Sequence, residues 1–491
     1  MADPHAQQEF QTQEDGQPHR VFQSPLVGRY ASRSMIERFG AVNRTLIWRR
    51  LWIALATAQQ KLGLPISDWQ IQQLTDTCET IDFERVAHYE KKLRHDVMAH
   101  VHAWGDVAPD ARGILHLGAT SAFIVDNADL IIMRDALREI AAQTANVITS
   151  LADFAVEHRA LPALGFTHFQ PAQVTTVGKR AALWCYDFLL DLHEIEHRIE
   201  RLRFRGTKGT TGTQASFLAL FEGDHDKVCA LDAALAAFFE FELAEPVTGQ
   251  TYSRKVDAQV AAALAGIASS VHKFSNDVRL LANLKELEEP FATDQVGSSA
   301  MAYKRNPMRC ERATGLARFV ISLSQSPLQT HAEQWLERSL DDSANKRLSI
   351  PESFLATDAM LGIIHNVAGG LVVYPEVIRS NLQRELPFMA TENLLMAATS
   401  QGGDRQELHE LIRRHSLDAA REVKEHGRPN DMIDRLRKDE AFANVDFDRE
   451  LDASRFVGRA PEQVIEFVEE HVEPVRQRYG SKLTQPGDLD V

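Results

Sequence analysis

The strongest constraint on the fold of this chain is a long heptad seam between residues 130 and 154. Its positions are spaced alternately by three and four residues, and seven of the eight are apolar: Leu130, Met133, Leu137, Ile140, Thr144, Val147, Leu151 and Phe154. This spacing predicts one helix about 40 Å long. A helix of that kind is not stable alone in water, so it must pack on other helices or on other subunits.

Two further stretches carry the same kind of pattern. A second seam comprises Val260, Leu264, Ile267, Val271, Phe274, Val278 and Leu281, and a helical stretch over 181–202 places Leu192, Ile195, Ile199 and Leu202 on one face. Strand signals are sparse, and no alternation of strands with helices is visible. We therefore predict an all-α protein in which a central bundle of long helices assembles into a tetrameric core.

The length of 491 residues suggests about three domains. Residues 1–24 are polar, rich in Gln and without periodicity, which predicts a disordered tail. We expect an N-terminal helical domain over 25–120 and a central long-helix domain over 121–373. After Tyr374-Pro375 the helical segments become shorter and are separated by Gly and Pro, which predicts a C-terminal helical domain over 374–491.

Charge and cysteine content narrow the class of protein. The chain carries 54 Lys and Arg against 69 Asp and Glu, a net charge of −15, which argues against a general nucleic-acid binder but not against a local basic pocket. The chain has four cysteines, which are Cys78, Cys185, Cys229 and Cys310. They are far apart and form no C-x-x-C pair, which favours a reducing compartment. No secretory signal and no membrane span is visible, so we predict a cytoplasmic protein.

The most specific local motif is the segment 297–307, which reads GSSAMAYKRNP. We expect it to follow a helix that ends near Glu289-Pro290 and to precede a helix that begins near Pro307. The glycine and paired serines suggest a mobile loop with two hydroxyls, two cations and an amide beside a helix N-terminus, which favours bound anions. By composition alone it could equally be an ordinary polar linker.

Two other short segments contain candidate functional side chains. His168 stands in a predicted turn before a long helix, and Thr167, Gln170 and Gln173 around it could orient its ring or line a pocket, although a lone histidine is more often structural than catalytic. Arg94, His95 and Asp96 are consecutive, so they could bind an anion and hold a histidine protonated, or they could form a solvated helix face.

Two patterns suggest other chemistry but have weak support. His193 and His197 fit the H-E-x-x-H zinc pattern, yet they lie in a highly charged helix and no third ligand motif follows. The segment 205–213, RGTKGTTGT, is rich in Gly and Thr and could hold an anion, but it is not a Walker A loop. We predict no metal and no cofactor.

Taken together, these segments resemble the fumarase/aspartase superfamily, whose signature is a Gly-Ser-Ser-x-Met-Pro-x-Lys-x-Asn-Pro loop on a long-helix core. Within it the chain is similar to the adenylosuccinate lyases of animal type, from about Ser24 to the C-terminus. The residues that carry the resemblance lie at 29–30, 92–100, 120–121, 166–172, 208–214, 248–254 and 303–307. One position departs from the signature, because Ala302 replaces the usual proline and leaves the loop more flexible before closure.

The resemblance implies β-elimination of fumarate from adenylosuccinate, giving AMP, and from SAICAR, giving AICAR, in purine nucleotide biosynthesis. It also implies that Ser298 is the base and His168 the acid, with Glu311 as the partner of the histidine. A serine acts as a base only if loop amides and Lys304 favour its ionised form in a closed site. His95 fits either phosphate binding or the acid step.

The same resemblance implies a set of substrate-binding positions. They are Arg29, Tyr30, Arg94, His95, Asp96, Thr120, Ser121, Gln250, Asn306, Arg312, Arg338, Ser343 and Arg347. A substrate with one phosphate and two carboxylates suits several arginine forks. In this family no subunit holds a whole site, so the resemblance implies a homotetramer with each active site shared between three subunits.

Three alternatives remain open from the sequence. Another lyase of the superfamily, such as argininosuccinate lyase, would release fumarate from a different substrate. A helical structural protein could keep the fold without the chemistry, although Ser298, His168, Lys304 and Glu311 are all present. A zinc protease built on His193 and His197 is the third.

Overall fold

The computed structural model describes residues 22–291, 295, 299–301 and 303–487. Most of the predicted tail, together with Ser298 and Ala302 of the loop, therefore lies outside the described residues. Helices make up most of the described chain, and its strands form only two small two-stranded sheets, which confirms the prediction of an all-α fold. None of its helices combines the length and the apolar character that a membrane span requires.

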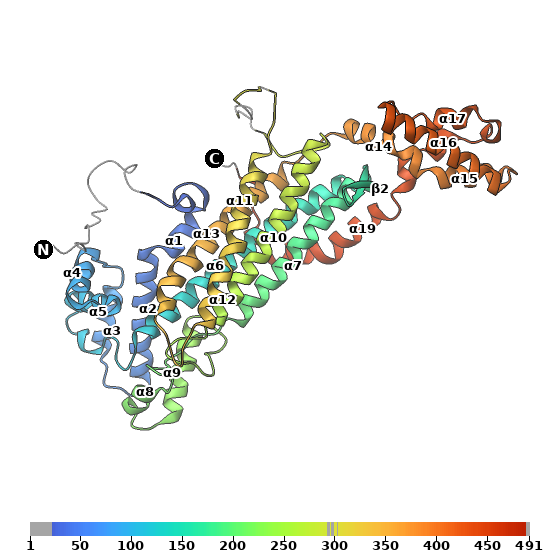
Figure 1. Ribbon diagram of the computed structural model, residues 1–491. Helices are drawn as coiled ribbons and strands as arrows, with labels where there is room; N and C mark the ends of the chain where they lie inside the picture. Colours follow the sequence, from blue (N-terminus) through green and yellow to red (C-terminus); the bar gives the residue numbers. More distant parts are fainter. Residues whose placement is uncertain (1–21, 292–294, 296–298, 302, 488–491) are drawn as a thin grey trace.

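Five long helices form a bundle at the centre of the molecule (Figure 1). They are α6 (Ser121–Glu157), α7 (Val177–Arg201), α10 (Lys255–Asn283), α11 (Met308–Leu323) and α13 (Asp341–Gly369). Every position of the first heptad seam is buried in α6, and every position of the second is buried in α10. The seams therefore face neighbouring helices, as their spacing predicts.

The N-terminal helices pack against one end of this bundle (Figure 1). Their bounds are η2 (Leu26–Tyr30), α1 (Arg33–Phe39), α2 (Ala41–Lys61), α3 (Asp68–Asp76), α4 (Phe83–Leu93), α5 (Asp96–Val107) and η3 (Arg112–Ile114). Leu51, Trp104 and Leu137 belong to one buried apolar cluster. The N-terminal helices and the bundle therefore share a continuous core.

The helices over residues 375–456 extend beyond the other end of the bundle and contain a second apolar cluster, which includes Leu394, Leu408 and Phe442, whereas the helices over 460–479 return along the bundle and pack on its core (Figure 1). Their bounds are α14 (Pro375–Met389), α15 (Thr391–Ser400), α16 (Arg405–His426), α17 (Met432–Lys438), η4 (Glu440–Phe442), α18 (Phe447–Glu450), η5 (Ala453–Phe456), α19 (Ala460–Phe467), η6 (Val468–Val472), α20 (Glu473–Tyr479) and η7 (Gly480–Lys482). Gly427 ends α16 in the left-handed conformation, with φ of 64°, which is the usual role of glycine at this position.

Short elements connect the bundle helices. They are β1 (Pro162–Thr167) and β2 (Gln170–Thr176), which form a hairpin between α6 and α7, α8 (Ala215–Leu220), α9 (His225–Phe238), β3 (Leu287–Glu288), α12 (Gln325–Ala332) and β4 (Val372–Val373). The helix expected to end near Glu289-Pro290 ends earlier, at Asn283, because the chain turns at Lys285, with φ of 59°, and then continues as β3, which pairs with β4. The next helix begins at Met308, directly after Pro307, as predicted.

Candidate active site

Many of the predicted substrate-binding residues line one open cavity of about 740 Å³, which we call the polar cavity. Its walls include Arg94, His95, Asp96, Thr120, Ser121, Gln250, Arg338, Ser343 and Arg347. These residues come from the α4–α5 junction, the start of α6, the segment before α10 and the start of α13. The fold therefore gathers side chains that are more than 250 positions apart in the sequence, since Arg347 contacts Asp96 at a separation of 251.

Local structure orients His95 toward Ser121. Arg94 ends α4 in the left-handed conformation, with φ of 53°, and His95 then caps the N-terminus of α5. The Met98 N–H donates to His95 Nδ1 over 3.3 Å, so this nitrogen carries no proton in the neutral ring. The proton is then on Nε2, which lies 3.3 Å from the Ser121 hydroxyl oxygen and can donate to it.

Arginines on α13 and just before it provide the positive charge of the polar cavity. Arg338 donates through Nη1 to the Gln250 side-chain oxygen over 2.9 Å, and Arg347 pairs with Asp96 over 2.9 Å. Both sides of the Arg347–Asp96 pair are partly exposed, so an anion can compete for the guanidinium. Guanidinium forks match carboxylate and phosphate groups, which suits an anionic ligand.

A buried ion network supports the floor of the polar cavity. Arg254 donates to Asp126 over 3.0 Å and to Asp342 over 2.7 Å, and Lys346 contacts Asp126 over 3.2 Å. Burial opposes ionisation of Asp126, but the charges of Arg254 and Lys346 outweigh it, so the pKa of this carboxyl lies below its ordinary value. Asp342 also lies 3.6 Å from Arg338, which links the network to the cavity wall.

Sequence reasoning missed most of this network. The segment 248–254, which contains Arg254, was a mark of the family resemblance, but nothing indicated Asp126, Asp342 or Lys346. A polar residue inside an apolar helix, such as Asp126 in α6, was the one available signal.

We predict that Arg254→Met destabilises the protein strongly, because it removes the guanidinium that forms ion pairs with the buried carboxylates of Asp126 and Asp342. The expected loss in the free energy of unfolding is about 3–5 kcal/mol. Urea unfolding followed by circular dichroism measures it. The matched control is Arg413→Met, which breaks an exposed pair with Glu410 and should cost less than about 1 kcal/mol. Equal losses in the two variants would contradict the structural role of the network.

The segment 205–213 does not present a free cation to an anion. Lys208 is buried and pairs with Asp232 over 2.6 Å. Arg205 is fully buried and donates to the carbonyls of Gly206, Gly209 and Gln250. The segment thus fixes the backbone that presents Gln250 to the polar cavity.

A second group of predicted residues surrounds Tyr30, near the start of α11. The guanidinium carbons of Arg29 and Arg312 each lie 5.8 Å from the centre of the Tyr30 ring. Lys304 and Asn306 precede α11 on the same chain segment. Glu311, in the first turn of α11, lies 3.8 Å from Arg279.

His168 forms a third group at the tip of the β1–β2 hairpin. His168 and Phe169 have φ of 54° and 55°, a pattern in which both central residues of a two-residue hairpin turn are left-handed. The His168 side chain is exposed. The sequence predicted a turn at His168 but did not indicate the hairpin around it.

One chain does not bring the polar cavity and the His168 hairpin together. α6 has 37 residues, so its two ends lie about 55 Å apart. Ser121 is at the first end, in the polar cavity, and the hairpin with His168 follows the other end. Figure 1 accordingly shows β2 and α5 on opposite sides of the molecule. Among the described residues, no hydrogen bond or ion pair joins Glu311 to His168, which the resemblance pairs; Glu311 lies near Arg279 instead.

The zinc alternative gains no geometric support. His193 and His197 are exposed on α7, and the glutamates between them are engaged elsewhere: Glu194 pairs with Arg198, and Glu196 accepts from Tyr479. Within the described ranges, no group of three or more His, Cys, Asp and Glu side chains is placed to hold a metal ion.

Comparison with known proteins identifies the family. A family model described as "Lyase" matches residues 54–322, and one described as "Adenylosuccinate lyase C-terminus" matches residues 387–467. The adenylosuccinate lyase of Saccharomyces cerevisiae is 52% identical over 94% of this chain and 97% of its own. The chain belongs to the adenylosuccinate lyase family. The family member from Schizosaccharomyces pombe is 50% identical over 94% of this chain and 97% of its own.

Solved structures agree with this fold. The 3-carboxy-cis,cis-muconate lactonizing enzyme of Pseudomonas putida superposes with a TM-score of 0.79 and covers 94% of this chain and 100% of its own, at 24% identity. This likeness concerns the arrangement of helices. The membership in the adenylosuccinate lyase family confirms the resemblance inferred from the sequence motifs.

Proposed function

We propose that this protein is an enzyme that cleaves adenylosuccinate to AMP and fumarate by β-elimination, in purine nucleotide biosynthesis. The observation that carries the proposal is the polar cavity, in which the family's substrate-binding residues converge although they are distant in sequence. Its volume of about 740 Å³ suits a nucleotide. Arg94, Arg338 and Arg347 supply charge for a phosphate and for carboxylates.

Each step of the reaction has a candidate residue in this chain. A base, Ser298, removes a proton from the carbon next to a succinyl carboxylate. The bond from the neighbouring carbon to nitrogen then breaks, and its electron pair goes to the nitrogen, which His168 protonates as acid. Lys304 and Asn306 bind a succinyl carboxylate and stabilise the negative charge that develops there. SAICAR contains the same succinylamino group, so we propose that it is cleaved to AICAR and fumarate by the same residues.

We further propose that the active enzyme is a homotetramer whose sites are each shared between three subunits. The length of α6 supports this, because it separates His168 from the polar cavity in one chain. Large apolar side chains exposed on the outside of the bundle also support it. They are Leu183, Tyr186 and Leu190 on α7, Leu280 on α10, and Phe319 and Ile321 on α11. In such an assembly Glu311 of one subunit can meet His168 of another.

The four cysteines are free, which fits our proposal of a cytoplasmic location.

A direct assay of the purified protein tests the proposed function. We expect AMP and fumarate to form in equal amounts from adenylosuccinate, followed by absorbance and confirmed by chromatography. Argininosuccinate is the control substrate and should release no fumarate. Release from argininosuccinate alone would favour the other lyase, and no release from either would favour a structural protein. Retained activity after treatment with a chelator is expected, while zinc-dependent peptide hydrolysis would support the protease alternative.

A further inference from the structure

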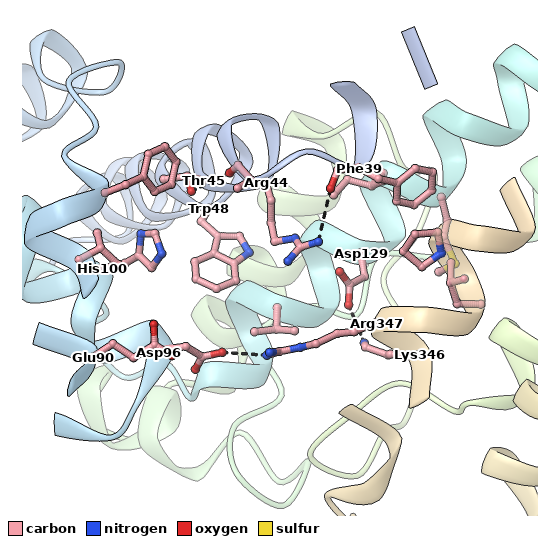
Figure 2. A pocket seen from close by; sticks show the side chains of 18 of the residues that line it. Phe39, Arg44, Thr45, Trp48, Glu90, Asp96, His100, Asp129, Lys346 and Arg347 are labelled. Atoms are coloured by element: carbon pink, nitrogen blue, oxygen red, sulfur yellow. Dashed lines mark hydrogen bonds and ion pairs between the residues drawn. The ribbon is translucent and has the colours of Figure 1, made fainter. Parts of the chain in front are cut away.

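A second cavity lies beside the polar cavity, and no residue role assigned above requires it. We call it the aromatic cavity; its volume is about 370 Å³. Its walls come from α1 and α2, α4, α5, α6, Tyr252 and α13 (Figure 2). Four residues line both cavities: Glu90, Asp96, Val125 and Arg347. The Asp96–Arg347 ion pair thus stands at the boundary between them.

The wall of the aromatic cavity suits an apolar ring. Phe39, Trp48 and Phe83 contribute aromatic surface, and Ile132 and Ile350 contribute aliphatic surface. A cavity with such walls and a few polar groups is the usual form of a small-molecule site.

Two hydrogen-bond donors in this cavity lack an acceptor. Trp48 is 5% exposed, yet its indole Nε1 makes no hydrogen bond within the described chain. Arg44 Nε is buried and also makes none. The two residues are four positions apart on α2, so they share one face of the helix, and Figure 2 shows their side chains next to each other in the cavity. Buried donors without acceptors are rare in folded proteins, because each loses its hydrogen bonds to water and gains none in the protein.

Arg44 is also the cation of this cavity that lacks an ion-pair partner within the described chain, although the carboxylate of Glu90 lines the same cavity. Lys346 pairs with Asp129 over 2.6 Å, and Arg347 pairs with Asp96 over 2.9 Å. In the part of the chain that the structure describes, Arg44 has no carboxylate within ion-pair distance, and its one hydrogen bond is a long contact of 3.5 Å to the Phe39 carbonyl. Burial lowers the pKa of His100 to about 4, so this neighbour is neutral at pH 7 and adds no competing positive charge.

We propose that the aromatic cavity binds a small aromatic carboxylate, with the ring against Trp48 and Phe39 and the carboxylate oxygens accepting from Arg44 Nε and Trp48 Nε1. A carboxylate would supply acceptors to both donors and an ion-pair partner to Arg44. The site is distinct from the polar cavity, where Arg338 and Gln250 lie. It does not depend on the proposed reaction.

Calorimetric titration of the intact protein with naphthalene-1-carboxylate tests this site. We expect saturable binding with one site per chain. Arg44→Met should weaken binding at least ~10-fold, because it removes the guanidinium and its charge, and Trp48→Phe should weaken it by about threefold, because it removes the indole N–H while keeping an aromatic ring. Arg50→Met is the matched control, since Arg50 is exposed on the same helix outside the cavity. The affinity of this variant for naphthalene-1-carboxylate should stay within about twofold of the wild-type value.

Ligand chemistry gives an independent readout on the unmodified protein. Naphthalene-1-carboxamide, which keeps the ring but lacks the charge, should bind at least ~10-fold more weakly than the acid. Equal affinity for acid and amide, undiminished binding by Arg44→Met, or no saturable binding would overturn the proposal. Loss of binding in Arg338→Met would also overturn it, because the probe would then occupy the polar cavity. If Arg44→Met does not fold, Trp48→Phe and the amide comparison decide the question.

Discussion

Replacement of His168 with alanine is expected to lower kcat for adenylosuccinate cleavage at least ~10²-fold, because loss of a general acid typically has an effect of this size. The hairpin should remain intact, since the His168 side chain is exposed and makes no hydrogen bond or ion pair with the rest of the described chain. Stopped-flow or steady-state absorbance at 25 °C measures the rate, and circular dichroism confirms that the fold is unchanged.

The matched control for this variant is His193→Ala. His193 is an exposed histidine on α7, so its loss should leave kcat within about twofold of the wild type, as surface substitutions usually do. An unchanged rate in His168→Ala would remove this residue from the mechanism. A larger loss in His193→Ala than in His168→Ala would point to chemistry on α7 instead.

Replacement of Ser298 with alanine is expected to abolish turnover while substrate binding is retained. The reason is that the hydroxyl is proposed to act only in proton removal, which follows binding. Its assignment rests on the motif GSSAMAYKRNP, since Ser298 lies outside the described residues. Single-turnover kinetics and equilibrium binding of adenylosuccinate to the variant separate the two effects.

The neighbouring serine provides the control for this experiment. Ser299→Ala also removes one hydroxyl group from this loop, and the kcat of this variant should remain within about tenfold of the wild-type value. Activity of Ser298→Ala within tenfold of the wild type would refute the base assignment. Complete loss of turnover in Ser299→Ala alone would assign the role of base to Ser299.

The sequence predicted the bundle because heptad spacing is a local signal. The periodicity at Leu130 to Phe154 specifies both a helix and the face that it buries, without knowledge of its neighbours. The β1–β2 hairpin was not indicated, because Pro162, Gly165 and Pro171 interrupt any regular alternation. The early end of α10 depends on pairing between β3 and β4, which are far apart in the chain.

The site was predictable only where a motif carries it. The family resemblance predicted the substrate-binding residues, and the fold gathers many of them in the polar cavity. The network beneath them joins Arg254 to Asp342 across 88 positions and Lys346 to Asp126 across 220. The aromatic cavity likewise depends on how six helices meet around Trp48. No local pattern encodes such contacts, so they required the three-dimensional structure.

The central claim is that His168 acts in a site whose other parts belong to different chains. Mixing His168→Ala with Ser298→Ala under conditions that exchange subunits tests it most directly. A site recovers when it takes His168 from a Ser298→Ala chain and Ser298 from a His168→Ala chain. Random exchange in equal amounts should restore about a quarter of the wild-type activity per site, while each variant alone stays inactive. No recovery, after mass spectrometry has shown that mixed tetramers formed, would contradict shared sites and place the whole site within one chain.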